Sequence, residues 1–200
     1  MNNTILSKGK GKILECFYNN RDKELYFSQI LRATSLTPNT TLKHLKALES
    51  NKLVISTKKI ANTFYKINNK NPLIFSIFSH FDYKQLNNLP SARKRAIIEF
   101  LDKIKTKPLI VLIFGSTAKK TYTGESDIDT LLVFNKKELK NNKLKEDIEA
   151  ITGSNIQEFM ISYEYFKEQV LKGEDKVISH AIKTGFVVLG HHYLYKEVLR

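Results

Sequence analysis

LIVLIFGSTAKKTYTGESDIDTLLVF, residues 109–134, is the stretch that decides the fold of this chain. Its apolar ends predict two buried strands, the first over Leu109–Phe114 and the second ending at Phe134. Asp127 and Asp129 stand at the start of the second strand, with one residue between them. Side chains alternate along a strand, so both carboxylates are expected on the same face. Because neighbouring carboxylates repel each other, the pair predicts a divalent cation between them.

The segment between the two strands supplies candidate phosphate ligands. Gly115 has no Cβ, so its backbone can approach a bulky anion closely. Ser116 adds a hydroxyl and an amide N–H at the start of a short predicted helix, where an anion is favoured. Either Lys119 or Lys120 is a candidate to neutralise a triphosphate, although any loop lysine has that capacity. Transfer of a phosphoryl-type group needs mainly positioned phosphates and metal ions, and this segment predicts both.

The order of strand, Gly-Ser, loop, Asp-x-Asp and strand resembles the nucleotidyltransferase superfamily that includes DNA polymerase beta. Within it, the minimal nucleotidyltransferases of archaea and bacteria are the nearest group. The resemblance rests on Gly115, Ser116, Asp127 and Asp129. It implies an α+β fold with a mixed sheet flanked by helices, bound Mg²⁺ or Mn²⁺, and ATP or another nucleoside triphosphate as substrate. A surface turn with two solvated aspartates is the alternative, but that structure does not require Gly-Ser upstream.

The superfamily usually carries a third carboxylate on the following strand, which is predicted here over residues 155–161. Gln157 and Glu158 are the candidates, and as adjacent residues they face opposite ways. Glu158 is the expected third metal ligand and catalytic residue, since it would complete a two-metal set. If Gln157 faces the aspartates instead, the site has two acids and a weaker second metal position. The strand register, which the sequence alone does not fix, decides between them.

Composition limits the remaining possibilities. The chain has 200 residues, of which 42% are hydrophobic, enough for a packed core. Its single cysteine, Cys16, excludes a disulfide framework and a cysteine-based zinc cluster. No apolar run is long enough to cross a membrane, and the polar, lysine-containing start does not resemble a signal peptide. We therefore expect a cytoplasmic protein.

The positive charge is unevenly distributed along the chain. Residues 1–72 hold 13 Lys and Arg against 4 Asp and Glu, a net charge of +9. Residues 73–200 hold 20 against 16, a net charge of +4. A basic module followed by a nearly balanced one suggests a polyanion-binding part and a catalytic part.

The basic part resembles a winged helix-turn-helix, the DNA-binding domain of many bacterial and archaeal regulators. Helices are predicted over residues 8–18, 28–33 and 38–50, the last with Thr37 as its N-cap, and a hairpin over 53–67 follows. The apolar pattern predicts that the third helix buries Leu42, Leu45 and Leu48. The resemblance implies that this helix enters the major groove of DNA. The candidate DNA-binding residues on this helix and in the wing are Asn39, Thr40, Lys43, His44, Lys46, Lys58 and Lys59. The alternative is a module that only packs or binds protein.

Two domains are therefore predicted, with a boundary at Asn71-Pro72. Residues 1–71 form the winged helix-turn-helix and residues 72–200 the nucleotidyltransferase domain. The second domain divides into a helical connector (72–106), a catalytic core (107–162) and C-terminal helices (163–200). Arg93, Lys94 and Arg95 in the connector are candidates to meet nucleic acid or triphosphate, but a solvated basic face is the favoured expectation.

The resemblance also suggests a biological setting. Minimal nucleotidyltransferases often pair with a small helical HEPN protein in toxin–antitoxin modules, and others modify transfer RNA. The acceptor is therefore expected to be a hydroxyl of a protein or an RNA, with AMP from ATP as the transferred group. DNA, a HEPN-like protein, tRNA or a second copy of the chain are the candidate partners. The competing class is a non-enzymatic DNA-binding regulator that retains a degenerate nucleotidyltransferase fold.

Overall fold

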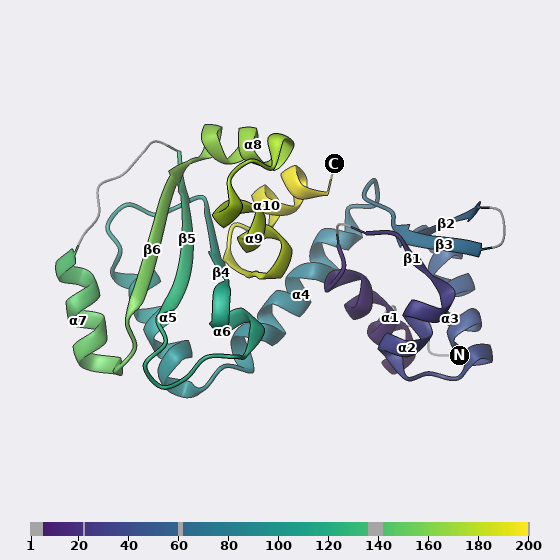
Figure 1. Ribbon diagram of the computed structural model, residues 1–200, viewed down its shortest axis with the longest axis horizontal. Helices are drawn as coiled ribbons and strands as arrows, with labels where there is room; N and C mark the ends of the chain where they lie inside the picture. The colour runs from purple at the N-terminus through teal and green to yellow at the C-terminus, as the bar shows by residue number, and fades with distance from the viewer. Residues whose placement is uncertain (1–5, 22, 60–61, 136–141, 200) are drawn as a thin grey trace. The chain divides into compact units, whose positions relative to one another are not determined.

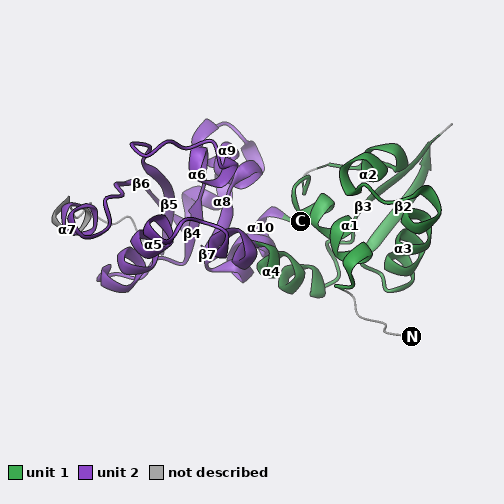
Figure 2. Ribbon diagram, turned by 90° about the horizontal axis from the view of Figure 1, so that it is seen from below, with its two compact units in different colours: residues 1–81, 199 green, residues 82–198, 200 purple. Residues whose placement is uncertain are grey.

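The computed structural model (Figure 1) describes residues 6–21, 23–59, 62–135 and 142–199. The chain forms two compact units that divide between Phe81 and Asp82, inside helix α4 (Leu73–Asn87), as Figure 2 shows. The boundary predicted from the sequence lies just before the same helix. In the part of the chain that the structure describes, no helix has the length and apolar character needed to cross a membrane.

The first unit combines helices with a three-stranded antiparallel sheet of order β1-β3-β2. Its elements lie close to the predicted positions. They are α1 (Lys8–Tyr18), β1 (Leu25–Tyr26), α2 (Phe27–Thr34), α3 (Pro38–Ser50), β2 (Val54–Lys59) and β3 (Asn62–Ile67).

Helix α3 begins where the sequence predicts, but its buried face is rotated. The Thr37 side chain accepts a hydrogen bond from the backbone N–H of Thr40, which caps the helix. The buried stripe consists of Thr41, Leu45 and Leu48. Leu42, which was expected in this stripe, is 40% exposed. Each residue turns a helix by about 100°, so with Thr41 facing inward its neighbour must turn away from the core.

The second unit is built on a mixed four-stranded sheet of order β6-β5-β4-β7. Strands β5 and β6 are parallel, whereas β4 pairs antiparallel with β5 and with β7. This confirms the α+β class with a mixed sheet. The elements that follow α4 are α5 (Ser91–Lys103), β4 (Ile110–Ile113), α6 (Gly115–Lys119), β5 (Ile128–Phe134), α7 (Asn142–Thr152), β6 (Ile156–Ser162), α8 (Tyr163–Lys172), α9 (Lys176–Thr184), β7 (Phe186–Leu189) and α10 (His191–Val198).

The two faces of this sheet have different roles. One face joins α5 and α7 in a core cluster that includes Phe100, Ile128, Leu132, Ile148 and Ile156. Because side chains alternate along a strand, the odd-numbered residues of β5 and β6 on the other face point away from this cluster. On that other side the Phe114 ring lies against Phe159 of β6 and His180 of α9, and α8 packs beside α9. The sheet therefore separates a dry core from the face on which the aspartates lie.

The buried carboxylate of Asp82 in α4 forms hydrogen bonds with β7 and α10, the last strand and the last helix of this unit. Asp82 is fully buried and accepts hydrogen bonds from the Val187 backbone N–H (3.0 Å) and from the Tyr195 hydroxyl. Hydrogen bonds of this kind offset the cost of burying a charged group. They hold β7 and α10 in place at the edge of the sheet.

Candidate functional site

The Gly-Ser turn and the second aspartate meet at the end of β4. Gly115 has a left-handed φ of +64°, and a Cβ built on it would lie 1.9 Å from Oδ2 of Asp129. The backbone N–H of Phe114 donates a hydrogen bond to the Asp129 carbonyl oxygen at 3.0 Å. Two segments separated by a loop thus form one continuous site, with the turn in direct contact with the carboxylate.

The two aspartates lie together, as the Asp-x-Asp spacing predicts. Both side chains are half-buried, and Asn155 Nδ2 donates a hydrogen bond to Asp127 Oδ1 at 3.1 Å. Burial raises the pKa of Asp129, the charge of Asp127 raises it further, and His180 lowers it. A carboxylate held near a like charge gains from a bound cation. The electrostatics at these two residues therefore favour a divalent metal.

The strand register corrects the expectation for the third metal ligand. In the parallel pair β5–β6, Asp129 is opposite Gln157 and Thr130 is opposite Glu158. Residues paired in this way share a face of the sheet, so Gln157 lies beside Asp129, and its side chain is exposed. Glu158 faces the core side and is only 6% exposed. The structure thus places an amide, not a carboxylate, next to the two aspartates.

One residue of the site was missed by the sequence reasoning. Arg93 was expected on a solvated basic face, but it is only 5% exposed and donates hydrogen bonds to Thr117 and to the loop before Asp127. The signal was present in the sequence. Arg93 is spaced from Ala96 and Phe100 as the members of one helical stripe are, and both of these are buried. A charged residue at such a position indicates a buried polar contact.

The remaining residues of the Gly-Ser segment are more open. Ser116 is half-buried in α6, directly after Gly115. Lys119 and Lys120 are both exposed at the end of this helix, where Lys120 has a left-handed φ of 59°. The structure does not distinguish between the two lysines as candidates to meet a triphosphate.

Comparison with known proteins relates the middle of the chain to one protein family. Residues 95–183 match the family model described as "Polymerase beta, Nucleotidyltransferase". This match supports the nucleotidyltransferase superfamily. It includes Gly115 and both aspartates, and it begins two residues after Arg93. The comparisons with curated proteins and with solved structures give no match.

The segment that matches the family model contains two candidate metal ligands, Asp127 and Asp129. Among residues 6–21, 23–59, 62–135 and 142–199, no group of three or more His, Cys, Asp or Glu side chains is arranged to hold a metal ion. Asp127 and Asp129 still fit Mg²⁺, which proteins commonly bind with one or two carboxylates while substrate phosphates and water complete the shell. The donor set therefore suits a metal that arrives with a nucleotide.

The candidate DNA-binding residues lie outside the nucleotidyltransferase segment, in the first unit. On α3, Asn39, Lys43 and Lys46 are exposed, as expected. Thr40 is half-buried, and its hydroxyl accepts a hydrogen bond from that of Thr37 at 2.8 Å. Three of the predicted contacts on this helix thus remain open to a partner. Leu42 adds an apolar side chain to the same exposed face.

His44 departs from its expected outward position. It packs on α1, where a Cβ added to Gly9 would lie 2.1 Å from its Nε2 atom. Burial lowers the pKa of His44, and the charges of Lys10 and Lys43 lower it further. A half-buried side chain in this contact is not placed to contact bases. Its position corrects the expectation that all five helix residues face outward.

The wing lysines lie on a strand rather than in the hairpin turn. Lys58 and Lys59 are the last residues of β2, both exposed, and the residues at positions 60 and 61 lie outside the described ranges. Lys59 forms an ion pair with Glu24 and lies over the ring of Phe64. Both lysines belong to the hairpin ladder, in which Lys58 pairs with Thr63 and Lys59 pairs with Asn62.

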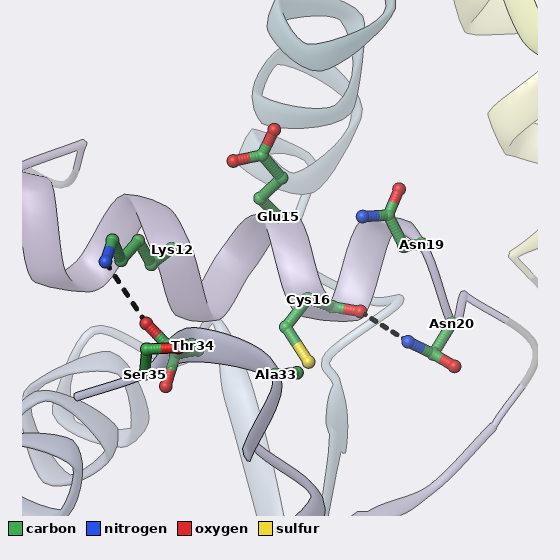
Figure 3. Close-up of a pocket in the computed structure, with 8 residues that line it drawn as sticks. All are labelled: Lys12, Glu15, Cys16, Asn19, Asn20, Ala33, Thr34 and Ser35. Carbon is green, nitrogen blue, oxygen red and sulfur yellow. Dashed lines mark hydrogen bonds between the residues drawn. The ribbon is translucent and has the colours of Figure 1, made fainter. Parts of the chain in front are cut away.

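A cavity of about 340 Å³ lies in the first unit, between α1 and the end of α2 (Figure 3). Some polar groups that line the cavity form hydrogen bonds with one another. Lys12 Nζ donates to the Thr34 carbonyl oxygen at 3.2 Å, and Asn20 Nδ2 donates to the Cys16 carbonyl oxygen at 2.9 Å. The residues that line this cavity all belong to the first unit, whereas Asp127 and Asp129 belong to the second.

Proposed function

We propose that the second unit transfers a nucleoside monophosphate, with AMP from ATP as the first candidate, to a hydroxyl acceptor. The observation that carries the proposal is the contact of the Gly115 backbone with the Asp129 carboxylate. It joins a place for phosphate to a place for metal in one site. The acceptor hydroxyl would lose its proton to solvent as its oxygen attacks the α-phosphorus. The bond from that phosphorus to the oxygen that bridges to the β-phosphorus would break, and pyrophosphate would leave with the bonding electrons.

The metal ligands in this proposal are Asp127 and Asp129. Bound Mg²⁺ or Mn²⁺ would supply charge that stabilises the transferring phosphoryl group and the leaving pyrophosphate. Asn155 holds one oxygen of Asp127 by a hydrogen bond, which orients that carboxylate. Gly115 and Ser116 would contact the triphosphate, and Lys119 or its neighbour Lys120 would neutralise part of its charge.

The first unit is proposed to be a winged helix-turn-helix that binds DNA. The support is the net charge of the N-terminal third, together with the exposed face of α3 that carries Asn39, Lys43 and Lys46. Lysines on such a face suit phosphates, while the asparagine amide suits a base edge. Lys58 would meet the backbone from the end of β2.

The acceptor class follows from this combination of parts. A transferase fused to a DNA-binding unit suits a toxin–antitoxin module that controls its own operon. In that case a hydroxyl of a HEPN-like protein partner is the acceptor. Transfer RNA is the alternative acceptor, held by the basic unit. A homodimer would present two copies of the DNA-binding unit to paired half-sites.

A non-enzymatic regulator is the second candidate function, and one observation favours it. Gln157 occupies the position beside Asp129 at which a third carboxylate would complete a two-metal site. A site with two acids has a weaker second metal position, which would suit nucleotide sensing better than rapid turnover.

One experiment separates the two functions. Purified protein is incubated with α-labelled ATP, Mg²⁺ and a lysate, next to the Asp127→Asn/Asp129→Asn variant. Label on a protein or RNA acceptor that disappears in the variant supports the transferase. Absence of transfer, combined with salt-sensitive binding to duplex DNA, supports the regulator. Binding of tRNA in place of duplex DNA would direct the search to an RNA acceptor.

A further inference from the structure

Arg93 has an environment unlike that of the other basic residues of α5. Its guanidinium donates from Nη1 to Thr117 Oγ1 at 2.9 Å. From Nη2 it donates to the carbonyl oxygens of Thr123 at 3.0 Å and Ser126 at 2.6 Å. Its Cζ atom lies 4.2 Å from the centre of the Tyr122 ring. One side chain thus contacts four residues on two different segments.

These two segments carry the two halves of the proposed site. Thr117 is in α6, two residues after Gly115. Ser126 immediately precedes Asp127 in the chain. Any change in the distance between Thr117 and Ser126 therefore shifts the phosphate-contacting turn relative to the first metal-binding carboxylate.

The loop that Arg93 holds is already partly closed on itself. The Thr123 backbone N–H donates to Ser126 Oγ at 2.9 Å, and the Ser126 backbone N–H donates to the Thr123 carbonyl oxygen at 3.3 Å. Arg93 Nη2 donates to the carbonyl oxygens of the first and last residues of this turn. These hydrogen bonds close residues 123–126 into one turn, and the arginine joins both ends of that turn to α5.

The chemistry of the contact requires arginine. A guanidinium presents several N–H groups in one rigid plane, whereas a lysine ammonium is a single point on a flexible stem. A planar group can also stack on Tyr122 while it donates sideways. Because Arg93 is buried, lost hydrogen bonds would not be replaced freely by water.

We infer that Arg93 is a positioning residue that sets the spacing between the Gly115–Ser116 turn and Asp127. This inference rests on the proposed function, because it concerns the assembly of that same site. Arg93 does not touch the reacting atoms. It acts through Thr117 on one side and through Ser126 on the other.

The test uses the full chain and measures Mn²⁺ binding by electron paramagnetic resonance, which does not depend on turnover. Arg93→Lys keeps the positive charge but loses the planar set of N–H donors. We expect its Kd for Mn²⁺ to rise about tenfold. Arg95→Lys is the matched control, since Arg95 is exposed on the same helix and pairs only weakly, at 3.8 Å, with Glu99. We expect the control to match the wild type.

A second pair of variants leaves Arg93 in place. Thr117→Val removes the hydroxyl that accepts from Nη1 with little change of shape, while Thr117→Ser keeps it. We expect weaker Mn²⁺ binding in the first and recovery in the second. In a labelled-ATP assay, Arg93→Lys should lower kcat by 10- to 100-fold, because displacements on the scale of 1 Å have effects of that size.

The possible outcomes distinguish failure of the positioning role of Arg93 from failure of the proposed nucleotidyl transfer. If the wild type binds Mn²⁺ in a manner that Asp127→Asn abolishes, but folded Arg93→Lys and Thr117→Val bind equally well, the positioning role is wrong and the metal site stands. If the wild type binds no more Mn²⁺ than Asp127→Asn does, the proposed function and this inference fail together. Thermal unfolding of each variant identifies any that fail to fold, and the Thr117 pair then decides.

Discussion

The Asp129 carboxylate fills the space in which any residue other than glycine at position 115 would carry its Cβ. The distance from that Cβ position to Asp129 Oδ2 is 1.9 Å, and to Cγ it is 2.8 Å. Real Cβ atoms do not approach other atoms this closely. The sequence suggests glycine here so that phosphate can approach. The structure adds a second requirement for glycine, since the Asp129 carboxylate already occupies this space in the absence of a nucleotide.

Replacement of Gly115 by alanine is expected to displace Asp129 and to weaken the site. Two effects act together, the overlap with the carboxylate and the left-handed φ of +64°, which costs a non-glycine residue about 1–2 kcal/mol. We expect Mn²⁺ affinity and nucleotidyl transfer to fall by about 100-fold, the scale expected of a 1 Å displacement. Mn²⁺ titration and urea unfolding of Gly115→Ala measure the two effects separately.

Gly124 provides the matched control for this substitution. A Cβ at Gly124 would meet no atom within 4 Å, and its φ is outside the left-handed region. Gly124→Ala lies in the same loop system and should bind Mn²⁺ as the wild type does. Unchanged binding in Gly115→Ala would show that the carboxylate does not need the space that the glycine leaves.

The charge of Asp129 is expected to lower the stability of the metal-free protein. Burial and the charge of Asp127 raise the pKa of Asp129 above its ordinary value of 3.8. The folded state therefore favours the protonated acid, and the stability contributed by this group falls as the pH rises above 3.8. At pH 7 without divalent ions, Asp129→Asn should be more stable than the wild type by on the order of 1 kcal/mol. Below pH 3.8 this difference should vanish, because both states then bind the proton.

Added Mg²⁺ should reverse the order of stability. A ligand that binds only the folded state stabilises it by RT ln(1 + [L]/Kd), about 2.7 kcal/mol at 100 times the Kd. The wild type should gain this stability and Asp129→Asn should gain little. Asp102→Asn, which changes an exposed aspartate on α5, is the control and should follow the wild type in both conditions. Urea unfolding in EDTA and in Mg²⁺ provides the measurement, and a variant that responds to Mg²⁺ like the wild type contradicts the assignment of the metal.

The alternation of side chains along a strand was sufficient to predict that Asp127 and Asp129 lie together, because the two residues are close in the sequence and the pattern is local. It was not sufficient for Gln157 and Glu158. Their orientation depends on the register between β5 and β6. These strands pair directly, but α7 separates them in the sequence, so the register is not a local property. A shift of one residue would have exchanged them. The flanking residue Ile156 contained the missing information, since an isoleucine suits the dry core more than the site.

The buried face of α3 was the second feature that the sequence did not predict correctly. Leu42 and His44 were assigned to the inner and outer faces of α3, and the structure has each rotated from that position. The apolar pattern of this helix is broken by Thr41, a polar residue that is fully buried and donates to the Thr37 carbonyl oxygen. Residue type alone misplaced the stripe by about one position. Gly9 on α1, which leaves room for the histidine ring, is visible as a site of close approach only once the helices are packed.

Gln157→Glu is expected to strengthen metal binding. The new carboxylate would stand beside Asp129, at a position of β6 where the Gln157 side chain is exposed. A third acid adds a hard ligand for a divalent cation, so the Kd for Mn²⁺ should fall by about tenfold and the number of bound ions should rise towards two. In EDTA the same variant should lose on the order of 1 kcal/mol of stability, since a third like charge joins the pair.

Glu158→Gln tests the same register from the opposite face. Glu158 lies opposite Thr130 on the core side of the sheet, so its substitution should leave Mn²⁺ binding unchanged. Electron paramagnetic resonance counts the bound ions in both variants. The register assignment is contradicted if Glu158→Gln weakens Mn²⁺ binding while Gln157→Glu has no effect.

The exposed face of α3 is expected to bind DNA mainly through charge. Lys43→Ala/Lys46→Ala removes two candidate phosphate contacts, so the slope of log K against log salt should decrease by about 2, with similar losses for all duplex sequences. Lys70→Ala, an exposed lysine in the connection after β3, is the charge control and should keep the wild-type slope. Asn39→Ala should instead reduce discrimination at one base pair by about 1–3 kcal/mol and leave the slope unchanged. Fluorescence anisotropy over a series of salt concentrations distinguishes these responses, and a double variant that keeps the wild-type slope would place the DNA contact elsewhere on the first unit.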